Sequence, residues 1–504
     1  MLIDARKVDR DRTFEADLCI VGAGAGGITI AREFTGRGFS VMLLESGGFE
    51  FEQENQALYR GETTGPFMPG RGTYLLRARS RYFGGSTNCW EGQCRPLDEI
   101  DFEERSWVPE SGWPFPKSHL ERFYERAASV CQITPFGYDV EKALSPGRPA
   151  LTVGDGDAIE TKLFHLSPPT HFGEVYRKEL VEAGNIQVLL HANVVDIVAN
   201  PNASAVDLVE VQCLTGNRLW VRAAFYVLAT GAVENARLLL SSNKLQKPGL
   251  GNQNGLVGRY FLEHANWIAG SLCLTRPSDS MSLYEGAAPE PGIGNPAFGA
   301  LCVKEDVQRR LQFLNSGFLL LRTSEVRGLM EAIGNVAFEI DHFGDEPASP
   351  GAPYYAMLYT RTEQTPNPDS RVTLSEELDA LGKPRVSLHW QLSDLDTQKI
   401  RELVEFLSRE LGRNSAGRVS LRVTDQNPWP LRPADHSMGT TRMHNDPKKG
   451  VVDPQCRVHG IANLYMGGSS VFPTCGFSNP TFTLVALALR LADHLSEALQ
   501  AARR

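Results

Sequence analysis

The chain has 504 residues, of which 42% are hydrophobic and 22% charged, and its formal net charge is −9 at pH 7. This composition is typical of a globular protein with two or three domains, at roughly 150 residues per domain. A negative net charge with both signs interspersed disfavours nucleic acid and anionic membrane surfaces as partners, and it leaves small molecules as the expected ones.

The sequence has no feature of an exported or membrane-spanning chain. Residues 1–17 are rich in charge and lack the apolar core of a signal peptide. The nine cysteines are an odd number without paired metal-ligand spacing, which favours reduced thiols and no metal site. Apolar runs such as 482–489 are shorter than the ~18 residues that cross a bilayer. We therefore expect a cytoplasmic protein with no membrane span.

The first predicted elements form a βαβ unit. An apolar run at 17–21 is followed at once by the glycine-rich sequence GAGAGG at 22–27. Residues 28–38 have helical spacing, and a second apolar run at 40–44 ends at an acid. Strand, glycine turn, helix and strand in about thirty residues are typical of a dinucleotide-binding unit.

Each glycine of this motif has a physical role. Gly22 permits the tight turn, Gly24 lets the backbone approach a pyrophosphate, and Gly27 brings the helix against the strand. The helix N-terminus would supply N–H groups to the phosphates, so Ala25 belongs to the predicted site. Glu45 is placed to accept from ribose hydroxyl groups and would repel a 2′-phosphate. The motif therefore disfavours NADP and leaves FAD and NAD open.

The rest of the chain alternates between two patterns. Residues 175–240 continue the helix and strand alternation, and the last seventy or so residues return to strand, loop and helix. Between them, residues 266–429 have a helical stretch at 394–411 and strand-like runs separated by proline-rich turns. The strand-like runs are 311–322, 354–361, 371–374 and 385–390. This order predicts an antiparallel sheet domain inserted into an α/β domain.

Residues 82–96, YFGGSTNCWEGQCRP, decide between the two cofactors. GGST followed shortly by RP resembles the flavin-site loop of the glucose-methanol-choline (GMC) FAD-dependent oxidoreductases. Residues 227–240, VLATGAVENARLLL, are similar to the second signature of that family. The blocks at 435–443, 450–460, 463–474 and 478–481 resemble its C-terminal half, in the variant of its pyranose oxidase and sugar dehydrogenase-like branch. The resemblance spans residues 15–496 in broken blocks.

The resemblance implies an α/β fold: a Rossmann-like FAD-binding domain with an inserted substrate domain built on an antiparallel sheet, as in p-hydroxybenzoate hydroxylase. The FAD-binding domain would be discontinuous, comprising 1–145, 172–265 and 430–504. The substrate-binding domain would comprise 146–171 and 266–429. The implied cofactor is FAD, bound without a covalent link.

Further cofactor contacts are carried over from the family motifs. The corresponding positions here are Gly84, Gly85, Ser86, Asn88, Cys89, Val194, Ala229, Gly468, Ser469, Asn479, Pro480 and Thr481. Gly467 stands where many members carry an acid, so only backbone contact is expected beside it. Cys89 occupies the place of the histidine that bonds flavin in covalent members. It either packs beside the flavin or forms a thioether to it.

Oxidation of an alcohol requires a base for the hydroxyl proton and a polar group that orients the oxygen. The resemblance assigns the base to His436 and its partner to Asn479, which could otherwise be a loop cap. Glu263 and His264 resemble a family acid-histidine pair, to which we give a structural role. The implied reaction is hydride transfer from a CH–OH group, on a sugar, glycoside or other polyol, to flavin N5.

Three alternatives remain open. The protein could oxidise a hydroxyl group on a larger secondary metabolite, or it could be a lyase that keeps FAD as structure. It could also be a redox-silent binding protein on the same scaffold. In the enzymatic cases that involve redox chemistry, oxygen or another acceptor would take the electrons from reduced flavin.

Overall fold

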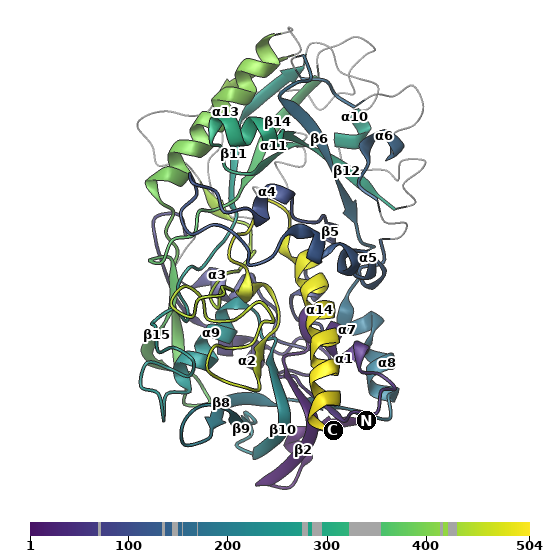
Figure 1. Cartoon of the computed structure of the whole chain (residues 1–504), viewed down its shortest axis with the longest axis vertical. Helices are drawn as coiled ribbons and strands as arrows, with labels where there is room; N and C mark the ends of the chain where they lie inside the picture. The colour runs from purple at the N-terminus through teal and green to yellow at the C-terminus, as the bar shows by residue number, and fades with distance from the viewer. Residues whose placement is uncertain are drawn as a thin grey trace.

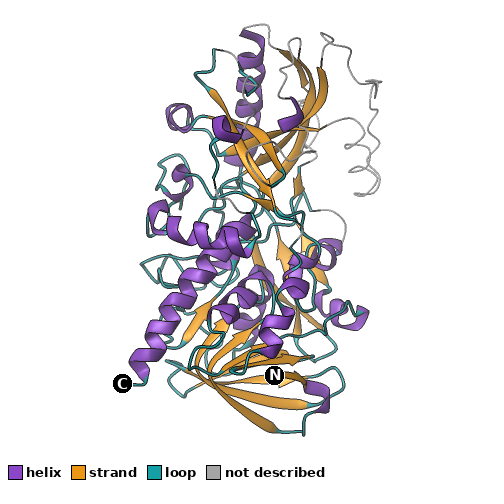
Figure 2. Cartoon of the chain, turned by 90° about the vertical axis from the view of Figure 1, so that its right-hand side faces the viewer, coloured by secondary structure: helices purple, strands orange, loops and turns teal. Residues whose placement is uncertain are grey.

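The computed structural model describes residues 1–68, 72–133, 137–143, 150–153, 155–168, 170–274, 281–284, 295–321, 354–413, 417–421 and 431–504. Two large sheets lie at opposite ends of an elongated molecule, and both chain termini lie at the same end (Figure 1). The view in Figure 2 shows most of the helices between the two sheets and beside the lower one.

The first sheet is mostly parallel and has the order β1-β7-β3-β2-β10-β9-β8, with β19 paired to β10. Its strands are β1 (Leu2–Asp4), β7 (Ile186–Leu190), β3 (Val41–Leu44), β2 (Arg12–Val21), β10 (Arg218–Leu228), β9 (Val206–Gln212), β8 (Asn193–Ala199) and β19 (Leu464–Met466). All four residues of β3 are buried, as expected for a parallel strand covered on both faces. The order brings strands from three distant parts of the sequence together.

Helices cover this sheet and connect its strands. α14 (Pro480–Ala502) packs against both α1 (Ala25–Glu33) and α5 (Glu121–Val130), and it runs along the lower half of the molecule (Figure 1). It buries Phe482, Val485 and Leu489, so the apolar run seen in the sequence is a core helix. The shorter helices are α2 (Gln53–Gln56), α3 (Thr73–Arg77), α4 (Glu99–Phe102), α6 (Val140–Ala143), α7 (Phe172–Val175), α8 (Arg177–Glu182), α9 (Ala232–Ser241), α10 (Met281–Tyr284) and α11 (Glu305–Leu311).

The second large sheet is antiparallel and has the order β17-β11-β14-β13-β12-β6-β5, with β18 paired to β11. Its strands are β17 (Gly417–Leu421), β11 (Ala265–Leu274), β14 (Tyr354–Thr362), β13 (Ser316–Leu321), β12 (Ala297–Val303), β6 (Ile159–Leu166), β5 (Gln93–Cys94) and β18 (Arg432–Pro433). α13 (Asp394–Arg413) packs against β17 and confirms the predicted helical stretch.

One prediction for this region is partly wrong. The run 311–322 was expected to be a strand throughout, but Leu311 ends helix α11 and the strand β13 begins at Ser316. α11 has acids in its first turn and arginines in its last turn, which favours a helix over its own sequence.

A third, small sheet has the order β15-β16-β4. It joins the hairpin of β15 (Arg371–Leu378) and β16 (Pro384–His389) to β4 (Gly61–Thr64), and α9 packs on the hairpin. Thus part of the predicted substrate segment pairs with part of the predicted cofactor segment. The domain boundaries at 145/146 and 429/430 lie outside the described residues, and the division into two domains stays a prediction.

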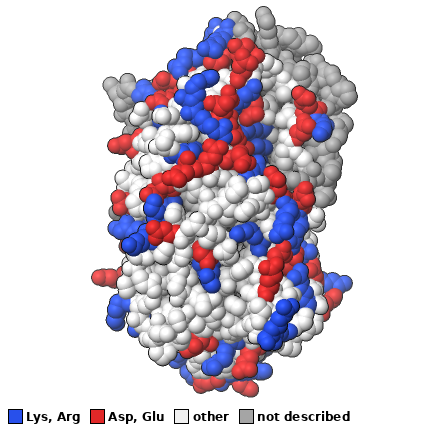
Figure 3. All heavy atoms as spheres, in the orientation of Figure 1, with Lys and Arg blue, Asp and Glu red and all other residues white. Residues whose placement is uncertain are grey.

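Acidic and basic side chains are intermixed on the face drawn in Figure 3, and a broad uncharged area covers the middle of its lower half. Within the described residues, no helix is long and apolar enough to cross a membrane. Within the same residues, no group of three or more His, Cys, Asp or Glu side chains is arranged to hold a metal ion.

Candidate active site

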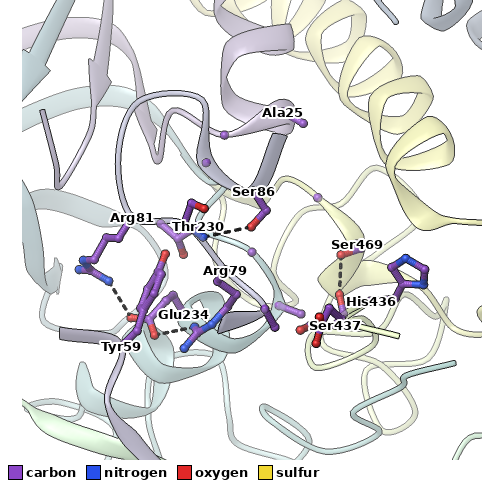
Figure 4. A pocket seen from close by; sticks show the side chains of 18 of the residues that line it. Ala25, Tyr59, Arg79, Arg81, Ser86, Thr230, Glu234, His436, Ser437 and Ser469 are labelled. Carbon is purple, nitrogen blue, oxygen red and sulfur yellow. Dashed lines mark hydrogen bonds and ion pairs between the residues drawn. The ribbon is translucent and has the colours of Figure 1, made fainter. Parts of the chain in front are cut away.

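A cavity of about 620 Å³ runs between the parallel sheet and the antiparallel sheet. Its wall combines the glycine motif, the GGST loop, β8, α9, strands of the antiparallel sheet and the start of α14. This volume lies in the usual range for small-molecule sites. In Figure 4 an arginine group around Glu234 lies on one side and His436 on the other.

The two glycine-rich loops are in direct contact at the centre of the cavity. Gly22 has φ +99°, and a Cβ atom there would lie 2.7 Å from the carbonyl oxygen of Ala229. Gly85 has φ +57°, and a Cβ atom there would lie 2.8 Å from Cα of Gly24. Only glycine fits such close backbone approaches at positive φ. The two sequence motifs therefore form one wall of the cavity.

Glu45 lines the cavity, as predicted for a ribose-binding acid, and it also holds the loops together. Its carboxylate accepts a hydrogen bond from the backbone N–H of Ala23 at 2.9 Å and from that of Gly47 at 3.0 Å. The side chain is almost fully buried. Glu45 therefore ties the end of β3 to the glycine turn and keeps a carboxylate at the cavity wall.

Most of the predicted site residues line this cavity. These are Gly22, Gly24, Ala25, Glu45, Gly85, Ser86, Cys89, Val194, Ala229, His436, Gly468, Ser469, Asn479, Pro480 and Thr481. Gly27, Gly84 and Asn88 are not among the lining residues. A Cβ atom on Gly27 would lie 1.9 Å from the carbonyl oxygen of Gly22, so this glycine serves helix packing. The Asn88 amide donates to the Phe83 carbonyl oxygen at 3.1 Å and holds the loop.

Cys89 lies on the GGST loop at the cavity wall and is exposed. Its Sγ atom is 3.4 Å from Oγ of Ser80 and 3.4 Å from the carbonyl oxygen of Ser86. The thiol therefore faces the cavity with only weak polar neighbours.

A charged cluster forms one end of the cavity. Glu234, from α9, contacts Arg79 at 3.0 Å, Arg81 at 3.4 Å and Arg237 at 3.2 Å; the first two contacts are drawn in Figure 4. Burial of Glu234 opposes its ionisation, but the three guanidinium groups outweigh it and lower its pKa to about 2. This end of the cavity therefore carries fixed charges.

Asn479 lies at the opposite end, directly before α14. It occupies the N-cap position of that helix, yet its side chain does not cap it. Instead, its Oδ1 accepts from Nη1 of Arg361 at 2.5 Å, and its Nδ2 lies 3.3 Å from Nε2 of His436. The side chain is thus aimed at His436, and the cap alternative raised by the sequence is not what the structure shows.

Glu263 fixes the backbone that carries His436. Both of its carboxylate oxygens lie 2.8 Å from the backbone N–H of His436, and Oε1 also accepts from that of His264 at 2.9 Å. The hydroxyl of Tyr74 is 2.5 Å from Oε2. Burial raises the pKa of Glu263 to about 8. This carboxyl group therefore anchors three segments at once.

The two histidine rings are in contact. Nδ1 of His264 lies 2.8 Å from Nδ1 of His436, and the rings meet edge to face. Burial lowers the pKa of His264 to about 3, and the Arg361 charge adds to this effect. Burial, His264 and Arg361 together hold the pKa of His436 well below its usual value. Both rings are therefore neutral at neutral pH.

Two family models match this chain. The model of the GMC oxidoreductases matches residues 366–488, and that of the FAD dependent oxidoreductases matches residues 17–252. The C-terminal part of the chain is therefore similar to the GMC oxidoreductases, and its first half is similar to the FAD dependent oxidoreductases. It is an FAD-dependent enzyme with the fold that the sequence predicted.

Two relatives match nearly the whole length of this chain. The 2-methyl-1,2-propanediol dehydrogenase of Mycolicibacterium austroafricanum is 24% identical, covering 96% of this chain and 95% of that protein. The 6‴-hydroxyparomomycin C oxidase of Streptomyces lividus is 26% identical, covering 95% and 92%. Formate oxidase of Aspergillus oryzae has a similar fold, with a TM-score of 0.56 at 16% identity over 97% of this chain and 99% of that one.

The residues that line the cavity fit FAD. α1 is nine residues long, and its first turn presents backbone at Gly24, Ala25 and Gly26 to the cavity, where N–H groups can donate to a pyrophosphate. Glu45 offers a carboxylate suited to ribose hydroxyl groups. At Gly22, where the turn begins, a Cβ atom would lie 2.7 Å from the carbonyl oxygen of Ala229, so the turn needs glycine at that position.

The sequence did not indicate a catalytic role for two residues that contact the predicted pair, His436 and Asn479. Arg361 lies on β14 and has no assigned role there, and His264 was given only a structural one. Arg361 is a buried charge in a strand whose other residues are all uncharged, and that departure was the available signal. Its contact with Asn479 crosses 118 positions of sequence and has no local pattern.

Proposed function

We propose that this protein oxidises a CH–OH group on a sugar, glycoside or other polyol, with His436 as the base and Asn479 as the group that orients the hydroxyl. The observation that carries the proposal is the convergence of His436 Nε2 and Asn479 Nδ2, 3.3 Å apart, on one cavity. Relatives named for a diol, for fructose and for a C-glycoside support the substrate class.

The roles of the two side chains follow from their atoms. A hydroxyl oxygen bound between them would accept a hydrogen bond from Nδ2 of Asn479 and donate its proton to Nε2 of His436. An imidazole with a lowered pKa is neutral at neutral pH, so it can take this proton. Bound FAD would supply the hydride acceptor. The residues of the glycine turn, the GGST loop and Glu45 would hold it.

The substrate would lie against the antiparallel sheet. The register pairs Asn266 of β11 with Arg361 of β14, and Ile268 with Tyr359, and all four side chains line the cavity. Trp90 lines the same region and donates from its indole to the Thr170 carbonyl oxygen at 3.2 Å. These side chains would exclude water from around the reacting carbon, and Asn266, Arg361 and Tyr359 would present polar groups to the substrate.

We propose that oxygen or another electron acceptor reoxidises the flavin, and that the protein acts in the cytoplasm. All nine cysteines are free, which suits a reducing compartment. FAD is proposed to be non-covalent, because the position of the family's flavin-linking histidine carries Cys89.

The test combines spectroscopy with one variant. The purified protein is expected to show flavin absorbance, to release FAD on acid precipitation, and to lose absorbance at about 450 nm on anaerobic mixing with a member of a sugar and polyol panel. His436→Ala should slow this bleaching about 10³-fold. His119→Ala is the control, because His119 is exposed and lies outside the cavity.

Each failure has a distinct meaning. Bleaching only by a larger alcohol would favour a tailoring oxidase, and flavin that no alcohol bleaches would favour a structural FAD in a lyase. A protein that does not take up FAD would contradict the proposal and leave a redox-silent binding protein. An unchanged rate in His436→Ala would reject His436 as the base.

A further inference from the structure

His436 belongs to a continuous series of hydrogen-bonding contacts. The series runs from Arg361 through Asn479 and His436 to His264, with successive distances of 2.5, 3.3 and 2.8 Å. Two of its members, Asn479 and His436, could each be oriented or protonated in two ways. The groups at the two ends decide between these alternatives.

Arg361 fixes which atoms donate and which accept at one end of this series of contacts. A guanidinium group only donates hydrogen bonds, so the Asn479 atom that it contacts must be the carbonyl oxygen, Oδ1. This contact turns the amide nitrogen, Nδ2, toward Nε2 of His436. An amide N–H can only donate, and Nε2 of His436 must therefore hold a lone pair.

The contact with His264, at the other end of the series, is compatible with the same donor and acceptor roles. Its ring is fully buried, and its Nδ1 lies 2.8 Å from Nδ1 of His436, whereas its Nε2 has no hydrogen-bond partner among the described residues. A neutral His436 with a lone pair on Nε2 carries its proton on Nδ1, so Nδ1 of His264 must accept that hydrogen bond and the proton of the neutral His264 ring lies on Nε2.

We infer that Arg361 and His264 are positioning residues that together fix neutral His436 as the tautomer with its proton on Nδ1 and its lone pair on Nε2. The inference rests on the proposed function, since it assigns the atom of His436 that takes the substrate proton. With the opposite tautomer Nε2 would carry hydrogen, and His436 could not take a proton there. The Nδ1–H bond to His264 would persist after Nε2 is protonated.

The tautomer can be measured without turnover. The FAD-loaded protein is labelled with ¹⁵N-histidine, and the variants His436→Gln and His264→Asn identify the signals of the two rings among the eleven histidines. The expected spectrum at neutral pH shows hydrogen on Nδ1 of His436 and on Nε2 of His264. Hydrogen on Nε2 of His436 would overturn the inference.

A pair of His264 variants tests the consequence for the reaction. His264→Asn keeps an oxygen near the position of Nδ1 that can accept from His436, and it should lower the rate of anaerobic flavin reduction less than tenfold. His264→Leu removes the acceptor and should lower that rate by about 10² or more. If His264 only filled space, the apolar leucine would be tolerated in this buried site and the asparagine would be the worse variant. FAD content and melting temperature of both variants serve as controls on folding.

Failure of the inference is distinct from failure of the proposed function. If the panel reduces the flavin of the wild type but the tautomer is reversed, or the order of the two variants is inverted, the inference falls and the function stands. If the tautomer is as expected and no alcohol reduces the flavin, the proposed function falls, and the positioning of His436 stands as a property of the fold.

Discussion

The two ends of the cavity bury ionisable groups to a similar extent and with opposite results. At one end Glu234 is 8% exposed and lies among Arg79, Arg81 and Arg237. Its pKa falls to about 2, because the nearby positive charges outweigh the cost of burial. At this end every group stays charged.

At the other end Glu263 and His264 lose their charge, although Arg361 nearby keeps its own. Glu263 and His264 are both 0% exposed. Burial raises the pKa of Glu263 to about 8 and lowers that of His264 to about 3. No guanidinium or ammonium group contacts the Glu263 carboxylate among the described ion pairs, so desolvation prevails there.

The two ends therefore differ in whether the buried carboxyl group contacts positively charged side chains. Paired charges make a rigid, permanently polar wall, which suits the recognition of a ligand. Buried imidazole groups that stay neutral at neutral pH keep a lone pair available, so one of them can accept a proton from the substrate, which suits catalysis. The four changes below test this comparison, and they are ordered from the largest expected effect to the smallest.

Glu263→Ala should have the largest effect. It leaves the buried backbone N–H groups of His264 and His436 without their acceptor, and it should lower the free energy of unfolding by about 5 kcal/mol. Glu263→Gln should cost far less at pH 7, because a group whose pKa is about 8 is largely uncharged there and glutamine resembles it. Chemical denaturation measures both.

The stability difference between the wild type and Glu263→Gln should depend on pH in a definite direction. The carboxyl group ionises at about 4.5 when unfolded and at about 8 when folded, so its favourable contribution is complete below 4.5 and is lost as the pH rises through 8. The stability of the wild type should fall relative to Glu263→Gln over that interval. If the stability of the wild type instead rose relative to that of Glu263→Gln as the pH increased, Glu263 would be buried as a carboxylate.

Glu234→Gln should have the next largest effect, and its pH dependence should be opposite. The pKa of Glu234 is about 2 when folded against 4.5 when unfolded, a difference worth about 3 kcal/mol. That contribution is complete above pH 4.5 and is lost as the pH falls through 2. Denaturation of wild type and variant at a series of pH values measures it. Glu376→Gln, at an exposed position, should show no such dependence.

Arg361→Met should change the pH dependence of catalysis. His436 must be neutral to accept a proton, so the rate of flavin reduction should rise as the pH rises through its pKa, which burial, His264 and Arg361 hold well below 6.5. Removal of the Arg361 charge should move this acid limb to higher pH. Arg361→Lys keeps the charge and should leave the limb in place. An unmoved limb in Arg361→Met would mean that His436 does not respond to this charge.

The glycine end of the cavity was predictable from the sequence and the sheet end was not. Gly22 and Gly85 are required by local backbone conformation and close contact, so each leaves a local signature. His436 and Asn479 were found through a motif. The partners that orient them come from other segments: Arg361 reaches Asn479 from a strand of the other sheet, through the pairing of β14 with β11. Such a contact depends on strand register, which is difficult to predict from a single sequence.

Cys89 lies on the loop between the two ends, and its substitution should have the smallest effect. Its thiol has only weak polar contacts, 3.4 Å from Ser80 and from Ser86, and no basic group contacts it within the described ion pairs and hydrogen bonds. Cys89→Ser should therefore leave flavin content, acid release of FAD and the rate of flavin reduction within about twofold of the wild type. If acid instead leaves FAD bound to the wild type and releases it from Cys89→Ser, the middle of the cavity holds its cofactor by a covalent bond. The contrast between a charged end and a neutral end would then no longer describe all of the binding.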